Sequence, residues 1–188
     1  MQPLFSDRSW HDYSEQLRIK AVAEVDKIDP SVLMGPPLDG ALQTIAARYT
    51  LKVPTLKLKN KTGTREEERR AIRDFGETRS VMVPIIEIAI PFEGDTEAFN
   101  ISPTRCQLGT QALLRRNALV FTVDDDDRVQ SEVDKFIAEV NLNLERLRED
   151  VKEWRPHLIT LLREAALARS DKLKSQRERD SKLDFPVG

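Results

Sequence analysis

The feature that most restricts the fold is a long run of apolar residues near the C-terminal end, spaced by three and four positions. The run consists of Val129, Val133, Phe136, Val140, Leu144, Leu147, Val151 and Trp154. This spacing predicts a single helix with a narrow apolar seam, similar to that of a coiled coil. A helix of about 27 residues rises roughly 40 Å, longer than a small sheet is expected to cover. Two alternatives stay open: the seam packs inside the chain, on the sheet or on a second helix, or part of it pairs with another subunit.

Pro156 interrupts this helical pattern. Beyond it, Leu158, Leu162, Ala165 and Leu173 form a second, weaker stripe within a charged stretch that continues to about residue 182. Proline removes a helical hydrogen bond and kinks or ends a helix. A kinked helix and a helical hairpin are both compatible with the pattern, and we favour the hairpin because each stripe needs a cover.

The first two thirds of the sequence mix helical and strand patterns. Apolar spacing predicts helices over residues 9–28 and 38–49, and alternation predicts strands over residues 53–61, 81–92 and 117–123. A turn at Glu93-Gly94-Asp95 suggests that residues 97–102 return as a strand. Residues 59–79 are very polar, and we expect a loop containing a helical turn there; residues 103–117 look irregular. The predicted class is α+β: N-terminal helices, a small antiparallel β-sheet and a long C-terminal helical hairpin or kinked helix.

Three parts follow from this pattern. Residues 1–123 form an α+β core, and residues 124–183 form the coiled-coil-like helical segment. Residues 184–188 turn apolar after a charged stretch, so we interpret them as the start of a linker to a downstream domain.

Composition indicates the size of the core and argues against several kinds of partner. Charged residues make up 33% of the chain and apolar residues 39%, which fits a modest core with long solvated helices. The net charge is only −2, so the whole chain is no strong attractor of nucleic acid or anionic lipid. Cys106 is the single cysteine, which excludes an internal disulfide. With no signal peptide or membrane-spanning run in the sequence, we expect a cytoplasmic protein without membrane contact.

Four consecutive aspartates, Asp124 to Asp127, lie between the strand at 117–123 and the long helix. Carboxylates at a strand end can bind Mg²⁺ or Ca²⁺, with Asp124 and Asp126 as the candidate ligands and Glu87 or Asp95 in support. Carboxylates also stabilise the start of a helix, by accepting free N–H groups and opposing the helix dipole. Consecutive side chains diverge, so we favour the helix start, and a metal-dependent enzyme is the weakest hypothesis.

Two basic segments, 57–73 and 169–182, suggest a nucleic-acid-binding alternative. The candidate contacts are Lys57, Lys59, Lys61, Arg169, Lys172 and Arg177. Acidic residues are interleaved with these, which favours a solvated surface over a phosphate-binding stripe. Since the sequence also contains no phosphate loop, dinucleotide fingerprint or zinc-ligand spacing, we expect no cofactor and assign no catalytic residues.

Several short motifs resemble a recurrent bacterial module. They are IPFEGD at 90–95, Phe99 with Ser102-Pro103, NALVF at 117–121 and LDFPV at 183–187. The module has Pro-Ser where this chain has Ser102-Pro103, and Gly where it has Asp184. Its members precede TIR-like or nuclease-like effector domains, which implies a setting in antiviral defence. Together with the seam, the resemblance predicts a non-catalytic recognition or oligomerisation module of a larger bacterial protein, with self-association or a protein partner through the long helices.

Overall fold

A computed structural model describes residues 1–74, 77–106 and 109–182. The chain divides into two compact units, and both use parts distant in sequence. The first comprises Met1–Trp10 and Lys52–Arg148; the second comprises His11–Leu51 and the chain from Glu149 onward. This division differs from the one expected at residue 123, because the last helix contributes to both units. Residues 184–188, interpreted as a linker, lie outside the described residues.

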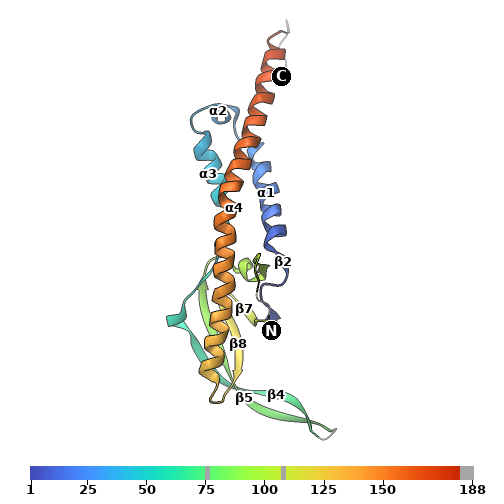
Figure 1. Cartoon of the computed structure of the whole chain (residues 1–188), viewed down its shortest axis with the longest axis vertical. Helices are drawn as coiled ribbons and strands as arrows, with labels where there is room; N and C mark the ends of the chain where they lie inside the picture. Colours follow the sequence, from blue (N-terminus) through green and yellow to red (C-terminus); the bar gives the residue numbers. More distant parts are fainter. Residues whose placement is uncertain (75–76, 107–108, 183–188) are drawn as a thin grey trace. The chain divides into compact units, whose positions relative to one another are not determined.

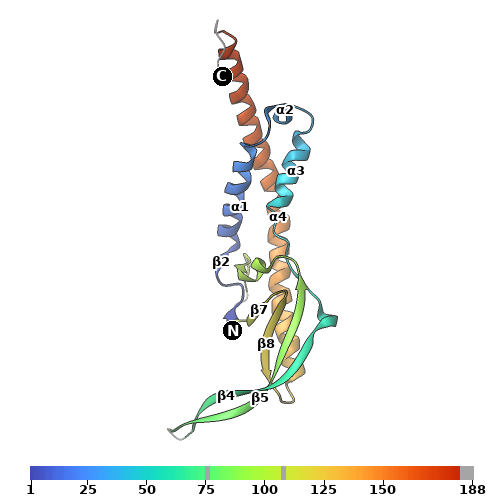
Figure 2. The same cartoon turned by 180° about the vertical axis from the view of Figure 1, so that it is seen from behind.

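The first unit is built on a mixed-length antiparallel sheet. Its strands run in the order β1-β7-β8-β5-β3, with β4 also paired to β5 (Figures 1 and 2). Their bounds are β1 Gln2–Pro3, β3 Thr55–Leu56, β4 Thr62–Asp74, β5 Glu77–Glu93, β7 Gln111–Arg115 and β8 Ala118–Asp124. A separate parallel pair joins β2 (Arg8–Ser9) to β6 (Ile101–Ser102). The strands predicted at 81–92 and 117–123 are therefore confirmed as β5 and β8.

One face of this sheet carries the core of the first unit. Ile88 and Ile90 of β5 lie opposite Phe121 and Leu119 of β8, so their side chains share that face. The first part of α4 (Val129–Asp180) packs there, with Val133, Phe136, Val140 and Leu144 in the same cluster. Phe121 and Phe136 are stacked with their ring centroids 3.7 Å apart. The period-two pattern of β5 and the helical pattern of α4 thus meet across one apolar layer.

The turn after β5 is fixed by Gly94 and Asp95. Gly94 has a φ of 132°, and a Cβ there would lie 2.7 Å from Pro54 Cα. Asp95 accepts a hydrogen bond from the backbone N–H of Lys52 at 2.7 Å and donates its own backbone N–H to the Lys52 carbonyl at 2.8 Å. The Gly-Asp pair of the IPFEGD motif therefore has a structural role, because only glycine tolerates both this φ and this close approach.

The second unit is helical. It contains α1 (Trp10–Val25, entering from the first unit), α2 (Pro30–Leu33), α3 (Leu38–Arg48) and the second part of α4. Its core consists of Ala21, Val25, Leu33, Leu42, Ile45, Ala46, Leu158, Leu162 and Ala166. Helices predicted at 9–28 and 38–49 correspond to α1 and α3. The second stripe of α4 is therefore covered by the N-terminal helices.

The preference for a hairpin at Pro156 was wrong. Helix α4 continues from Val129 to Asp180 with Pro156 inside it. The hydroxyl of Thr160 donates to the Pro156 carbonyl at 3.1 Å, and Pro156 itself is exposed. A hairpin was favoured because each stripe needs a cover, but the sheet covers the first and α1 and α3 cover the second. Neither half of α4 needs to fold back on the other.

Three other local predictions were also wrong. Residues 59–79 contain the short 3-10 helix η1 (Leu58–Asn60), strand β4 and the start of β5, not a loop with a helical turn. Residues 97–102 contain the 3-10 helix η2 (Thr96–Asn100) and the two-residue β6, so they do not pair back onto β5. The supposedly irregular residues 103–117 include β7. A fourth prediction, the strand at 53–61, holds only for Thr55–Leu56, which form β3.

Within the described residues, no helix is both long and apolar enough to cross a membrane.

Candidate interaction surface

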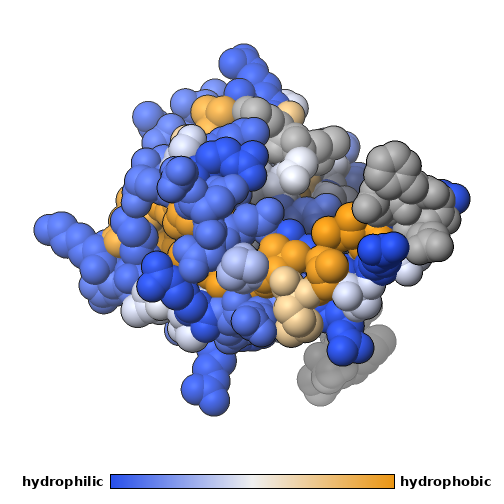
Figure 3. Space-filling model, turned by 90° about the horizontal axis from the view of Figure 1, so that it is seen from below, coloured by the Kyte–Doolittle hydropathy of each residue, from blue (hydrophilic) through white to orange (hydrophobic). Residues whose placement is uncertain are grey.

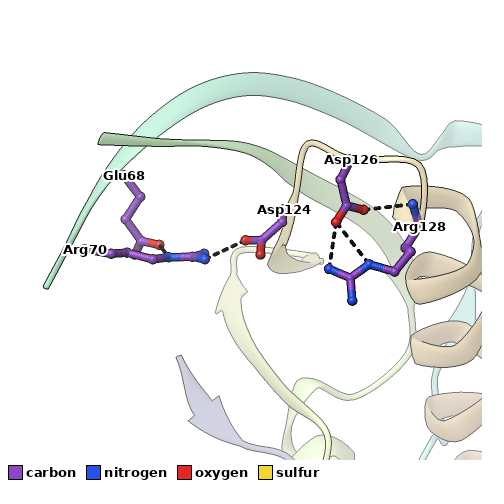
Figure 4. A network of polar contacts seen from close by, with 5 residues as sticks. All are labelled: Glu68, Arg70, Asp124, Asp126 and Arg128. Atoms are coloured by element: carbon purple, nitrogen blue, oxygen red, sulfur yellow. Dashed lines mark hydrogen bonds and ion pairs between the residues drawn. The ribbon is translucent and has the colours of Figure 1, made fainter. Parts of the chain in front are cut away.

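The first three aspartates of the 124–127 run bind arginine side chains. Asp124, the last residue of β8, accepts from Arg70 of β4 at 2.6 Å, and Asp125 accepts from Arg65 of β4 at 2.9 Å. Asp126 accepts from the Arg128 guanidinium at 2.7 Å (Figure 4). The run therefore connects β4 to the turn between β8 and α4.

The ion pairs of this network shift the pKa values of its members. The Arg128 side chain and backbone N–H both donate to Asp126, and they hold the pKa of its carboxyl below the ordinary value of 3.8. Glu68 at 2.7 Å and then Asp124 raise the pKa of Arg70. Figure 4 shows Arg70 reaching both acids. Carboxylates already bound to guanidinium groups are poor candidates for ion ligands, since an ion would have to displace the arginines.

The metal candidates Asp124 and Asp126 thus have other partners. Across residues 1–74, 77–106 and 109–182, no group of three His, Cys, Asp or Glu side chains converges in a way that could hold a metal ion. Asp126 instead accepts the backbone N–H of Arg128 at 2.8 Å, directly before α4 begins. Such a bond two residues ahead is an Asx turn, which leads the chain into the helix. The preceding aspartates tie the helix start to β4.

The basic candidate residues fall into two groups, one in each unit. Lys57 pairs with Glu93 at 2.6 Å; Lys59, within η1, and Lys61, directly after it, are exposed. In the second unit, the Arg169 guanidinium donates to the carbonyls of Val25 and Ile28 at 2.7 and 2.6 Å, at the C-terminal end of α1.

The remaining two basic candidates are on the last turns of α4. Arg177 lies 3.9 Å from the Met34 sulfur, and Lys172 is exposed at the edge of a hollow with Asp26 and Gln176. Because Lys57 and Arg169 already have partners inside their own units, the two segments do not present a row of free cations.

The seam of α4 was the predicted interaction site. Five of its residues, Val133, Phe136, Val140, Leu144 and Leu147, are at most 9% exposed within the single chain. The chain itself covers these five residues, so they contribute no free surface, and contact of the seam with another subunit stays a prediction. Val151 and Trp154 are half-buried, and Trp154 packs against the core of the second unit.

A different surface emerges from β4 and β5. Beyond the end of β8, residues 67–74 of β4 and 77–84 of β5 pair only with each other among the described strands. We call this two-stranded extension the arm. Figures 1 and 2 show it running past the rest of the sheet of the first unit. Two-stranded ribbons are marginal in water on their own, so the ion pairs of Arg70 and Arg65 to the β8–α4 turn help to hold the base of the arm.

The arm exposes apolar side chains on both of its faces. Ile72 is 47% exposed and Met82 is 53% exposed, and their register puts them on opposite faces. Seen from below, the surface is mostly hydrophilic, with separate apolar patches between the hydrophilic residues (Figure 3). Sequence reasoning missed the arm because a ribbon that is solvated on both faces has no period-two pattern. The available signal was the length of the strong strand pattern at 81–92, which needs a partner of equal length.

Comparison with known proteins adds no relative to this description: no family model, curated protein or solved structure matches the chain at a significant level.

Proposed function

We propose that this chain is a non-catalytic recognition and oligomerisation module, and that the arm is its docking element. The observation that carries the proposal is the arm itself: it extends past the sheet, buries little of its own apolar surface and leaves Ile72 and Met82 about half exposed. A two-stranded ribbon with an open strand edge is a template for pairing with another chain, and a partner on the arm would also cover part of these apolar side chains.

The charged residues support the same proposal. The aspartates before α4 are bound to arginines of β4 and of the turn, so they serve the geometry of the arm base. The basic residues of 57–73 and 169–182 are divided between the two units and partly paired, which favours a protein partner over nucleic acid. The resemblance of the motifs between residues 90 and 187 to a bacterial module adds the biological setting of the proposal, a larger bacterial effector of antiviral defence.

The experiment compares the intact chain with an arm-shortened variant. Glu66 and Ile85 face each other in the β4–β5 ladder, so residues 67–84 can be replaced by Asn-Gly, the preferred two-residue hairpin turn. Light scattering over a wide concentration range measures the mass of each protein. We expect the intact chain to self-associate and the shortened chain to remain a folded monomer, since residues 85–91 of β5 keep their pairing to β8.

A matched control alters exposed apolar residues outside the arm. Ile19 and Leu167 are 58% and 55% exposed, close to the values for Ile72 and Met82. The variant with Ile19→Ser and Leu167→Ser should associate like the intact chain. Association that survives removal of the arm, or that is lost in this control, would contradict the proposal.

A further inference from the structure

The outer edge of β4 is an open strand edge of 13 residues. β4 pairs with β5 on one side, and in the described part of the chain no strand pairs with its other side. All residues from Lys61 to Arg69 are exposed. An open edge is a ready template for pairing with a further strand, and proteins usually protect it with charged residues.

The charges along this edge have an unusual order. Glu66, Glu67 and Glu68 form an acidic block, which is followed by Arg69, Arg70 and Arg73. If two copies of β4 align antiparallel, the acidic block of each copy approaches the basic block of the other. Opposite charges directly across a ladder stabilise it, and like charges destabilise it.

Symmetry limits the registers that two identical strands can adopt. Opposed residues in an antiparallel pair point to the same face of the sheet. A two-fold axis that relates the strands must therefore pass between one residue and the same residue of the second copy. An axis at Glu68 overlaps all 13 residues, because Glu68 is the midpoint of Thr62–Asp74.

This central register also gives the best match of charges. Glu67 faces Arg69 of the second copy, and Glu66 faces Arg70 of the second copy, whose guanidinium also binds Glu68 and Asp124 of its own chain. By symmetry this makes four opposite pairs. The single like pair is Glu68 with its own copy, and each Glu68 already binds Arg70 of its own chain at 2.7 Å.

The neighbouring registers are less favourable. An axis at Glu67 opposes Glu66 to Glu68 and Arg65 to Arg69, all like charges. An axis at Arg69 retains an opposite pair next to the axis, but it opposes Arg65 to Arg73 and places two arginines on the axis itself. Length and charge therefore select the same alignment, although they are independent properties of β4.

We infer that two copies of the chain associate edge to edge through β4, antiparallel and centred on Glu68, to form a continuous β5–β4–β4–β5 ribbon. The inference rests on the proposed function and names the partner of the arm as a second copy. A closed two-fold contact uses the same patch on both subunits. In this arrangement, both open β4 edges are removed at once.

Charge reversal at Glu67 and Arg69 tests the register. Neither residue has an ion-pair partner among the described residues, and both are exposed, so single substitutions leave the fold intact. Glu67→Arg places an arginine opposite Arg69 of the second copy, and Arg69→Glu places a glutamate opposite Glu67. We expect each variant to raise the dissociation constant of the dimer about tenfold or more, since two pairs per dimer change sign.

The decisive part of the experiment is a mixture of the two variants. A chain with Glu67→Arg and a chain with Arg69→Glu regain both opposite pairs when they meet, so the mixture should form a heterodimer by sedimentation velocity. The double variant E67R/R69E in one chain should also recover self-association. Circular dichroism confirms folding of every variant.

The outcomes separate the inference from the proposed function. If the wild-type chain associates and both single variants associate equally well, or if their mixture stays monomeric, edge pairing of β4 is overturned while the arm remains a docking element. If the wild-type chain is monomeric at every concentration, both the inference and the proposed self-association are overturned.

Discussion

The two halves of β5 contrast within one strand. Residues 85–91 all pair with β8, residues 85–89 pair with β4 as well, and Ile88 and Ile90 are at most 5% exposed. Residues 77–84 have only β4 as a partner strand, and Met82 is 53% exposed. The hydrogen-bonding ladder is continuous, so backbone pairing does not distinguish the halves. The halves differ in the burial of their side chains. The inner half stabilises the fold, and the outer half is exposed and available to a partner.

The largest expected effect comes from truncating one isoleucine in each region. Ile90 is fully buried, so Ile90→Ala should lower the free energy of unfolding by about 2–5 kcal/mol. Ile72 on the arm is 47% exposed, and Ile72→Ala should change it by no more than about 0.5 kcal/mol. Urea unfolding at a protein concentration that keeps the chain monomeric measures both. An equal decrease in the free energy of unfolding for the two variants would contradict the difference between the core and the arm.

A second prediction concerns α4, whose first part packs on the sheet and whose second part packs on α1 and α3. Pro156 lies inside the continuous helix, where a proline costs about 3 kcal/mol relative to alanine. Pro156→Ala should therefore raise the free energy of unfolding, by up to about 3 kcal/mol. The exposed His157→Ala serves as a control for a local change without a proline. Destabilisation by Pro156→Ala would argue that the chain turns at this residue after all.

A smaller effect is expected at the base of the arm. Asp124→Asn removes the charge that Arg70 binds at 2.6 Å. Exposed ion pairs add little to global stability, so the melting temperature should barely change, while amide exchange in residues 67–74 should accelerate. Asp134→Asn, on the exposed side of α4, is the matched control. Unchanged exchange in the arm would mean that the ion pair does not hold it.

The smallest effect concerns acid. Arg128 lowers the pKa of Asp126 below 3.8 in the folded chain, so this carboxylate stabilises the fold at pH values above 3.8. The contribution is lost as the pH falls below 3.8 towards the lower pKa of the folded state. Thermal unfolding of the wild type and of Asp126→Asn should therefore differ near neutral pH and converge in acid. A difference that persists in strong acid, well below the folded-state pKa, would contradict this role.

The sequence was sufficient for elements whose environment repeats regularly. The alternation of Ile86, Ile88 and Ile90 predicts β5, and the steps from Val129 to Leu144 predict the first half of α4, because each faces one continuous apolar layer. The α+β class followed from these two patterns. The expectations of a cytoplasmic location and of a larger bacterial protein stay predictions.

Features that depend on distant parts of the chain could not be predicted. Pro156 suggests a break, but whether the chain turns depends on what covers Leu158 and Leu162, and α1 and α3 do so from about a hundred residues away or more. Among the aspartates, Asp126 accepts the Arg128 N–H directly before α4, but the arginine partners of Asp124 and Asp125 are known only once β4 is placed. β4 itself was missed because its side chains are solvated on both faces.

The most direct test of the central claim is hydrogen–deuterium exchange at low and high protein concentration. If the open edge of β4 is the contact between copies, peptides that cover residues 62–74 should gain protection as the concentration rises. Peptides of the α4 seam and of residues 85–91 should not change. Protection that rises instead along α4 between Val151 and Leu173, with β4 unchanged, would contradict the account.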